Sequence, residues 1–317
     1  MNRNKISTNF ILAAAVFFAA AMVVFPSITE SGSKSAIIIW ANSIVPILLP
    51  FFIFADFIKR TVNTERLPGR VYPFIIAFLS GYPAGAKIVG DLVRGGSLTK
   101  EEGEEVLSYS LVTGPGFILG TIGAFLGSYK AALIVAIAHY AGAFCNCVFY
   151  RIPKRERSLH QYERSRSKGR GRNHAKGAFL SEGKTSPLEN FTAAISSAFK
   201  SMAVILAYLI VFMIAIDLLE AFGAFRQIAG EPLRAFLKGI FEMTVGCNLL
   251  GLCDMNLSMK TALTAFIVSF GGLSVIGQSI SMAAGSGIGA GKIFRIKLTH
   301  GLLAGIIAVV LSLLVVQ

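Results

Sequence analysis

The 317-residue chain is a succession of long apolar runs separated by short polar connectors. Several runs reach the roughly 20 residues that an α-helix needs to cross the hydrocarbon of a bilayer. The pattern predicts seven membrane-spanning helices, at residues 10–26, 36–58, 106–127, 131–150, 191–219, 261–283 and 298–316. The predicted fold class is therefore an all-α polytopic membrane protein.

The first apolar run, residues 10–26, follows Arg3 and Lys5, a layout that a secretory signal peptide shares. The alanines at 19–21 resemble the small residues of a cleavage site. The run is long, however, and ends at Pro26 with further apolar runs behind it. We favour a retained first span over a cleaved signal peptide.

Two further apolar runs contain residues that a lipid-facing helix has no use for. Residues 71–93 include the stretch SGYPAGAKIVGD, and residues 239–253 include the stretch FEMTVGCNLLG. Gly and Pro interrupt the helical backbone, and the freed backbone groups are tolerated in a membrane only where protein or a water-filled cavity surrounds them. Such segments point to the binding site in transporter folds. We predict two re-entrant helical hairpins here.

The second half of the chain repeats features of the first half in the same order. Gly271 follows Gly114 by 157 residues, and His300 follows His139 by 161 residues. The glycines of the second hairpin likewise follow those of the first by 161 residues. An inverted repeat of this kind builds a site near the midplane between its halves. The predicted domains are an extra span at 1–33, a first half at 34–150, a basic loop at 151–189 and a second half at 190–317.

Charge is concentrated in one connector and sets the predicted orientation. The chain is 54% hydrophobic and 15% charged, with a net charge of +13, whereas soluble proteins carry about 25% charged residues. Residues 151–184 contain eleven Lys and Arg against three Glu. Because cytoplasmic loops are enriched in Lys and Arg, we expect this loop, the N-terminus and the basic connector 292–297 inside the cell. The C-terminus is then outside, and the hairpins enter from opposite sides.

The basic loop also limits the expected partners. Its charge fits anionic lipid headgroups and the setting of topology. It lacks the interleaved aromatic residues that stack on nucleic-acid bases, so no nucleic-acid partner is expected.

Lys87, Asp91 and Glu242 are ionisable residues in or beside the two hairpins. A charge at membrane depth costs several kcal/mol unless it is paired or hydrated, so each is a functional candidate. Lys87 and Glu242 come from opposite halves and are placed to pair near the midplane. A structural ion pair, or a side chain reaching toward the membrane surface, is the alternative. Asp91 stands near Arg94, which favours an interface charge.

Two pairs of polar residues have the i, i+4 spacing that places side chains on one helix face. Thr244 and Asn248 flank the predicted second turn, and Ser274 and Gln278 lie in one span, facing the predicted cavity. Helix–helix hydrogen bonding explains Thr244 and Asn248 equally well.

The remaining candidates are Gly and Pro residues at which interrupted helices expose backbone groups to a solute, with close helix packing as the alternative. They are Gly81, Pro83, Gly85, Gly114, Pro115, Gly246, Gly271 and Gly272.

Little in the sequence favours an enzyme. No His, Asp and Glu cluster has metal-ligand spacing, no Ser/His/Asp set stands out, and the glycine-rich loop ending at Lys292 fails the Walker pattern. No metal, cofactor or catalytic activity is predicted, and any transport is expected to be secondary or passive. His139 and His300 are interpreted as hydrogen-bonded structure, with a proton relay as the alternative.

Four motifs stand out: SGYPAGAK from Ser80, GPGFILGT from Gly114, EMTVGC from Glu242 and FGGLSV from Phe270. Together they resemble the sporulation integral membrane protein YlbJ family. The resemblance covers residues 35–316. It implies a nucleoside-recognition (Gate) domain, also found in ferrous iron transporters and distantly related to concentrative nucleoside transporters, in a membrane of an endospore former. Val245 departs from the family pattern, which has an asparagine beside the threonine.

These observations lead to two functional hypotheses. The first is a Gate-type secondary transporter or channel for a small polar solute such as a nucleoside, bound between the hairpins. The second is a non-transporting membrane scaffold in spore-envelope assembly that acts through partner proteins at the basic loop.

Overall fold

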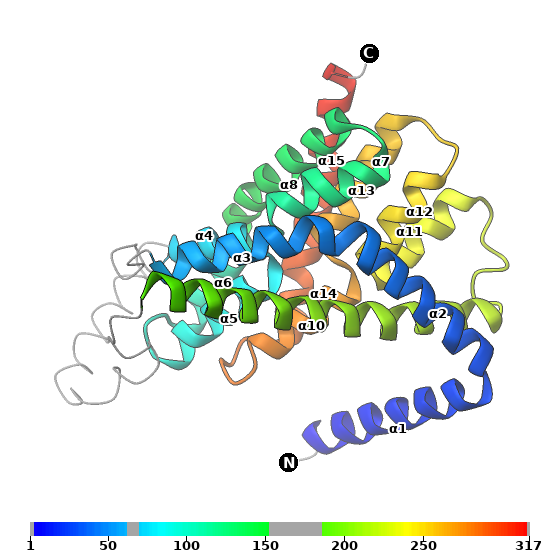
Figure 1. Cartoon of the computed structure of the whole chain (residues 1–317), viewed down its shortest axis with the longest axis horizontal. Helices are drawn as coiled ribbons and strands as arrows, with labels where there is room; N and C mark the ends of the chain where they lie inside the picture. Colours follow the sequence, from blue (N-terminus) through cyan, green and yellow to red (C-terminus); the bar gives the residue numbers. More distant parts are fainter. Residues whose placement is uncertain (1–2, 62–69, 152–185, 316–317) are drawn as a thin grey trace.

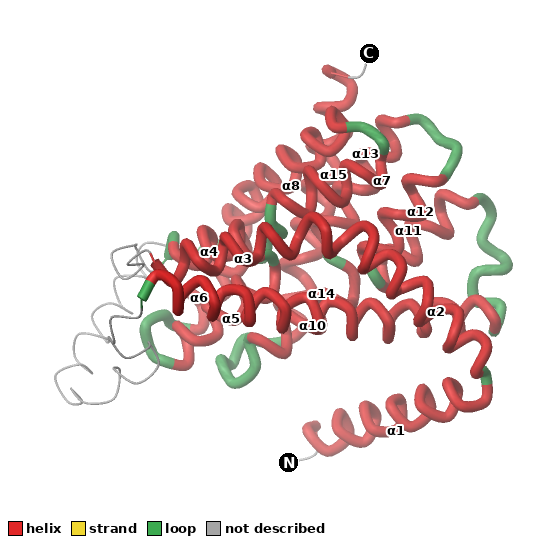
Figure 2. The backbone as a smooth tube through the Cα atoms, viewed as in Figure 1, coloured by secondary structure: helices red, strands yellow, loops and turns green. Residues whose placement is uncertain are grey.

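The computed structural model describes residues 3–61, 70–151 and 186–315. Throughout these ranges the regular structure is helical and no strand is present (Figure 2). Five helices of this part are long and apolar enough to cross a membrane: Pro26–Ile58, Tyr129–Phe149, Pro187–Ala221, Leu257–Met282 and Ala290–Leu314. The predicted all-α membrane fold is confirmed at this level.

These five helices match five of the seven predicted spans. The first predicted span, residues 10–26, lies mostly in α1 (Arg3–Val24). The third is divided, because α6 (Lys100–Ser110) ends well before η3 (Gly116–Ile122) and α7 (Gly123–Leu126) continue the chain.

The second span begins ten residues earlier than predicted. Pro26 occupies the first position of α2 (Pro26–Ile39), where its missing N–H has no helical partner to lose. A π-helical turn, η1 (Trp40–Ile44), connects α2 to α3 (Val45–Thr61). The wide turn precedes Pro46, which cannot donate the hydrogen bond that would continue an α-helix.

Both segments predicted to be interrupted are pairs of short helices. In the first, α4 (Tyr72–Ser80) and α5 (Tyr82–Arg94) meet at Gly81, whose φ of 81° favours glycine. In the second, α11 (Glu231–Phe241) and α12 (Met243–Leu252) meet at Glu242. This interruption comes earlier than the sequence predicted, so Thr244 and Asn248 do not flank the turn but lie within α12.

Two other interruptions occupy corresponding places. Residues 111–115 separate α6 from η3, and Gly271, with a φ of 82°, separates α13 (Leu257–Phe270) from α14 (Gly272–Met282). Gly81, residues 111–115, Glu242 and Gly271 are called the four interruptions below. The interruptions at Gly81 and at residues 111–115 lie between α3 and α8 (Tyr129–Phe149), and those at Glu242 and Gly271 lie between α10 (Pro187–Ala221) and α15 (Ala290–Val315).

The helices form a central block and a long outer pair. In the block, α8, α13 and α15 pack together with α6. In the outer pair, α10 lies along the continuous stretch of α2 and α3, across the block (Figure 1). α1 lies apart from the block at the bottom of Figure 1.

Large apolar side chains on the outer faces of α8 and α15 are exposed. They include Leu133, Ile137, Val148, Leu302, Ile306, Val310 and Leu314. So extensive an apolar surface fits contact with lipid rather than water. The chain is an integral membrane protein.

Candidate functional site

A cavity of about 390 Å³ lies where the four interruptions approach one another. Its lining includes Gly81, Thr113, Gly114 and Glu242 at three of the interruptions, and Ser274 in the first turn of α14, three residues after Gly271. Helices α3 and α10 supply the rest of the enclosure. The volume falls in the range of small-molecule sites.

The lining combines polar, apolar and charged side chains, and Ser80 on α4 and Ser197 and Ser201 on α10 add further hydroxyl groups to the residues named below. The polar floor is Thr113, Glu242, Thr244, Ser274 and Gln278. The apolar wall is Ile44, Leu48, Phe51, Phe52, Phe117, Val204 and Ile205. Charged side chains at Asp56, Lys87 and Lys200 also line it, and the two lysines are exposed.

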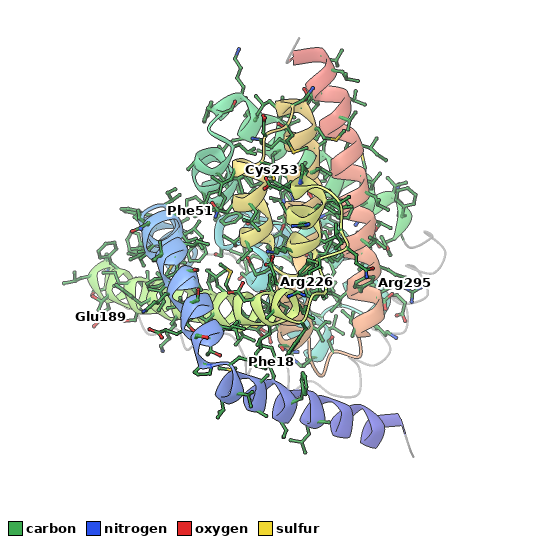
Figure 3. The ribbon with its side chains drawn as sticks, turned by 90° about the vertical axis from the view of Figure 1, so that its right-hand side faces the viewer. Phe18, Phe51, Glu189, Arg226, Cys253 and Arg295 are labelled. Carbon is green, nitrogen blue, oxygen red and sulfur yellow. The ribbon has the colours of Figure 1, made fainter. Side chains whose placement is uncertain are left out.

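Phe51, labelled in Figure 3, shows why glycine is needed beside the cavity. A Cβ atom at Gly114 would lie 3.2 Å from its ring, and one at Gly116 would lie 3.0 Å from it. The two glycines therefore let α3 approach the interruption at 111–115 closely, so the close-packing interpretation of Gly114 holds together with its place in the lining.

Glu242 is buried and caps the N-terminus of α12. Its carboxylate accepts a hydrogen bond from the Val245 backbone N–H at 2.8 Å and one from the Thr244 hydroxyl at 3.3 Å. A side-chain oxygen before the first helical turn satisfies N–H groups that have no helical partner. Glu242 therefore ends one helix, begins the next and places an acceptor in the polar floor.

The predicted pairing of Lys87 with Glu242 is not formed. Lys87 lies 3.7 Å from Asp91, one turn along α5, and Asp91 also pairs with Arg94 at 2.6 Å. Both oxygens of Glu242 are used by the cap instead. Lys87 and Glu242 nevertheless line the same cavity.

The other predicted site residues divide into two groups. Gly81, Lys87, Gly114, Glu242, Thr244, Ser274 and Gln278 line the cavity. Gly85, Asp91, Pro115, Gly246, Asn248, Gly271 and Gly272 lie outside its lining, and Pro83 is in the first turn of α5.

Several glycines outside the lining allow helices to touch. A Cβ at Gly85 would overlap the Ser110 carbonyl, and one at Gly246 would overlap the Cα of Gly239 in the paired helix. A Cβ at Gly272 would lie 3.1 Å from the Gly239 carbonyl oxygen. These glycines therefore position the half-helices.

A second polar layer behind the cavity holds the interruption at 111–115. The Thr113 N–H donates to Nε2 of His139 at 3.0 Å, and the Tyr140 hydroxyl donates to the Thr113 carbonyl at 2.9 Å. Since Nε2 of His139 accepts, we assign its proton to Nδ1, 2.8 Å from the Ser269 hydroxyl. His300 donates to the His139 carbonyl at 2.8 Å. These contacts agree with the interpretation of the two histidines as structure.

Two hydrogen bonds connect the interruptions of one predicted half to the other. The Tyr82 hydroxyl of the first half donates to the carbonyl of Val268 near the end of α13. Lys297 of the second half donates to the carbonyl of Leu111 at 3.2 Å, where α6 ends. Helix ends leave carbonyl groups without partners, and here each half supplies one partner to the other.

Lys297 is the site-adjacent residue that sequence reasoning misplaced. The pattern put it in a basic connector inside the cell, but α15 begins at Ala290, and the Lys297 side chain is fully buried. Its ammonium lies 3.9 Å from the centroid of the Tyr82 ring. His300, one turn along the same helix face, is the sequence signal that would have indicated an inward-facing Lys297.

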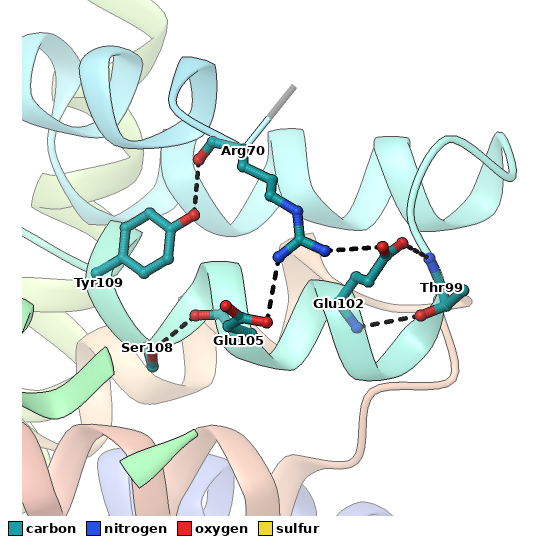
Figure 4. A network of polar contacts seen from close by, with 6 residues as sticks. All are labelled: Arg70, Thr99, Glu102, Glu105, Ser108 and Tyr109. Carbon is teal, nitrogen blue, oxygen red and sulfur yellow. Dashed lines mark hydrogen bonds and ion pairs between the residues drawn. The ribbon is translucent and has the colours of Figure 1, made fainter. Parts of the chain in front are cut away.

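The glutamates of α6 form ion pairs that hold neighbouring helices in place. Arg70 pairs with Glu102 at 2.7 Å and with Glu105 at 3.1 Å, and the Tyr109 hydroxyl donates to the Arg70 carbonyl (Figure 4). Lys292 pairs with Glu104 at 2.9 Å. These contacts fasten the start of α4 and of α15 to α6.

No group of three or more His, Cys, Asp and Glu residues within the described ranges has an arrangement that could hold a metal ion. The basic loop predicted at 151–189 lies almost wholly outside the described residues, as does the C-terminal end of the chain.

Sequence comparison links the chain to a known membrane protein. It is 26% identical over 346 residues to the sporulation integral membrane protein YlbJ of Bacillus subtilis (strain 168), an alignment that covers 98% of this chain and 84% of that relative. The resemblance to the YlbJ family is confirmed. No family model and no solved structure matches the chain.

Proposed function

We propose that the chain is a secondary transporter or channel for a small polar solute, and that the cavity at the four interruptions binds it. The observation that carries this proposal is the convergence of interrupted helices from both halves on one cavity with a polar floor. Irregular backbone at membrane depth is tolerated where it lines a cavity, and transporters place their binding sites at such interruptions.

The lining favours a solute with hydrogen-bonding groups and an apolar face. The first turns of α5, α12 and α14 all contribute to the lining, and helix N-termini carry partial positive charge and free N–H groups. Glu242 adds an acceptor on the floor. Phe51, Phe52 and Phe117 add aromatic surface to the lining. A nucleoside, which the implied Gate domain would recognise, has both kinds of group.

The name of the relative suggests the cellular process in which the chain acts. We propose that the chain acts in endospore formation, in a membrane whose cytoplasmic side carries the N-terminus and the basic loop, with the C-terminus outside. The loop would contact anionic lipid headgroups. A scaffold that acts through spore-assembly proteins is the competing function, and the experiment below separates the two.

The test is thermal stabilisation of the detergent-solubilised full chain by a panel of nucleosides, nucleobases, amino acids and dipicolinate. A ligand at 100 times its Kd stabilises a protein by about 2.7 kcal/mol. We expect one solute class to raise the unfolding temperature of the wild type and to have less effect on Gln278→Ala. Gln278 suits the test because its described hydrogen bond, to Ser274, is 3.5 Å long.

Asn248→Ala is the matched control, because Asn248 lies on α12 outside the cavity lining. A shift that persists unchanged in Gln278→Ala would place the binding site elsewhere. If no solute acts, deletion of residues 152–184 decides between the functions: a scaffold loses its sporulation phenotype without the loop, whereas a transporter keeps it.

A further inference from the structure

Lys297 is an ionisable side chain in a position where a charge is costly. It is fully buried, and its ammonium has two described contacts, the Leu111 carbonyl at 3.2 Å and the ring of Tyr82 at 3.9 Å. Within the described residues no carboxylate lies within ion-pair distance of it. A buried charge without a counter-ion is strongly disfavoured unless its position serves a purpose.

The ammonium lies at the junction of three interrupted helices. Leu111 is the C-terminal cap residue that follows α6, and Tyr82 is the first residue of α5. A Cβ at Gly271, the interruption between α13 and α14, would lie 3.3 Å from the Cε atom of Lys297. The C-terminal carbonyls of a helix carry partial negative charge. In ion-coupled transporters, such unwound carbonyls and half-helix ends hold the coupling cation.

The surrounding polar groups offer no anion that would account for the charge. His139 receives the Thr113 N–H at one nitrogen and contacts the Ser269 hydroxyl with the other, and His300 donates to the His139 carbonyl. The Tyr82 hydroxyl donates to the Val268 carbonyl. What faces the ammonium is a carbonyl oxygen and the electron-rich face of an aromatic ring, both of which favour a cation.

We propose that Lys297 is a tethered cation that occupies the place of a coupling cation, so that the solute-binding form of the cavity requires this ammonium and no sodium ion. The inference rests on the proposed transport function. Lys297 is a positioning residue, because it reaches the cavity only through others. Tyr82 presents its ring to Lys297 and also lines the cavity, and Leu111 leads directly to Thr113 and Gly114 in the lining.

The first measurement needs neither a solute nor a variant. The unfolding temperature of the purified wild type is compared in sodium, potassium and choline chloride at equal ionic strength. We expect no difference among the three salts. A specific, saturable stabilisation by sodium would overturn the proposal, because it would reveal a separate site for a metal cation.

The second measurement tests whether the charge itself is needed. Lys297→Ala removes three methylene groups and the ammonium, which n-propylammonium replaces. We expect n-propylammonium to raise the unfolding temperature of Lys297→Ala in a saturable manner, and 1-propanol, which is similar in size and neutral, to have no such effect. Lys292→Ala, on the same helix but paired with Glu104, should not respond to either.

Lys297→Met supplies a second variant that fills the space without a charge. For a solute found in the panel, we expect its affinity for the wild type to be equal in sodium and choline. It should fall at least about tenfold in Lys297→Met, the effect of losing one hydrogen bond to a charged group. Wild-type affinity in Lys297→Met, or equal rescue of Lys297→Ala by 1-propanol, would sink the idea. The salt comparison and the rescue by n-propylammonium can be measured even if no solute binds. A failure of the transport proposal is therefore distinguishable from a failure of the proposal for Lys297.

Discussion

Asn146 fastens three helices of the central block with one buried side chain, and its removal gives the sharpest test of the packing. Its amide nitrogen donates to the carbonyls of Ser108 on α6 and Ile296 on α15, each at 3.1 Å. Its amide oxygen accepts a hydrogen bond from the Thr299 hydroxyl at 2.6 Å. The side chain is fully buried.

Asn146→Ala has unequal effects on these three contacts. The Ser108 carbonyl is among the last four of α6, which have no helical partner, and leaving such a group unsatisfied costs about 1–3 kcal/mol. The Ile296 carbonyl and the Thr299 hydroxyl retain each other at 3.1 Å, so each of those two losses is closer to the roughly 0.6 kcal/mol average of hydrogen bonds between membrane helices. The expected loss of stability is about 2–4 kcal/mol in total.

The assay is reversible unfolding in detergent, from which the free energy of unfolding of each variant is obtained. Asn248→Ala is the control, since Asn248 is partly exposed on α12, and surface changes usually fall within about 0.5 kcal/mol. If Asn146→Ala were as stable as this control, the three-helix connection would not contribute to the fold as reasoned.

Two further predictions concern helix packing and the start of α4. Gly246→Ala should lose about 2–3 kcal/mol of unfolding free energy, because its new methyl group overlaps the paired helix. Gly277→Ala should gain about 0.5–1 kcal/mol, since no atom lies within 4 Å of the added methyl group and alanine favours the helix. Equal effects of the two substitutions would contradict the packing. Arg70→Ala removes charge-assisted hydrogen bonds to Glu102 and Glu105 and should lose about 1–3 kcal/mol of unfolding free energy. Arg70→Lys should be intermediate, because lysine lacks the two-pronged guanidinium. A wild-type unfolding free energy in Arg70→Ala would show that these pairs do not contribute to stability.

The apolar runs and the first interruption could be predicted from sequence because their signals are local. Gly81 combines freedom at positive φ with a proline two residues later, at the start of α5, and both residues disfavour an uninterrupted helix. At the second interruption the same reasoning chose Gly246. The structure instead uses that glycine for helix contact and turns the chain at Glu242, whose side chain caps the following helix.

The enclosure of the cavity could not be predicted, because a membrane helix is apolar on all sides. Phe51 on α3 and Ile205 on α10 line the cavity, while Phe54 and Val211 on the same helices are exposed, and since all four side chains are apolar, polarity does not separate them. Lys297 was missed for a related reason. A lysine near the end of an apolar run normally reaches the membrane surface, and only the tertiary arrangement places this one beneath Tyr82.

The unequal fastening of the cavity's sides has a consequence for how a solute could enter and leave. One side belongs to the central block, which hydrogen bonds through His139, Asn146 and Lys297 hold together. The other side is α3 and α10, and Trp40 joins their layer internally by donating to the Met202 carbonyl. Because α10 packs along both α2 and α3, these helices form one panel beside the cavity. We therefore expect the block to stay stationary while α2, α3 and α10 move together, so that opening and closing are movements of the panel.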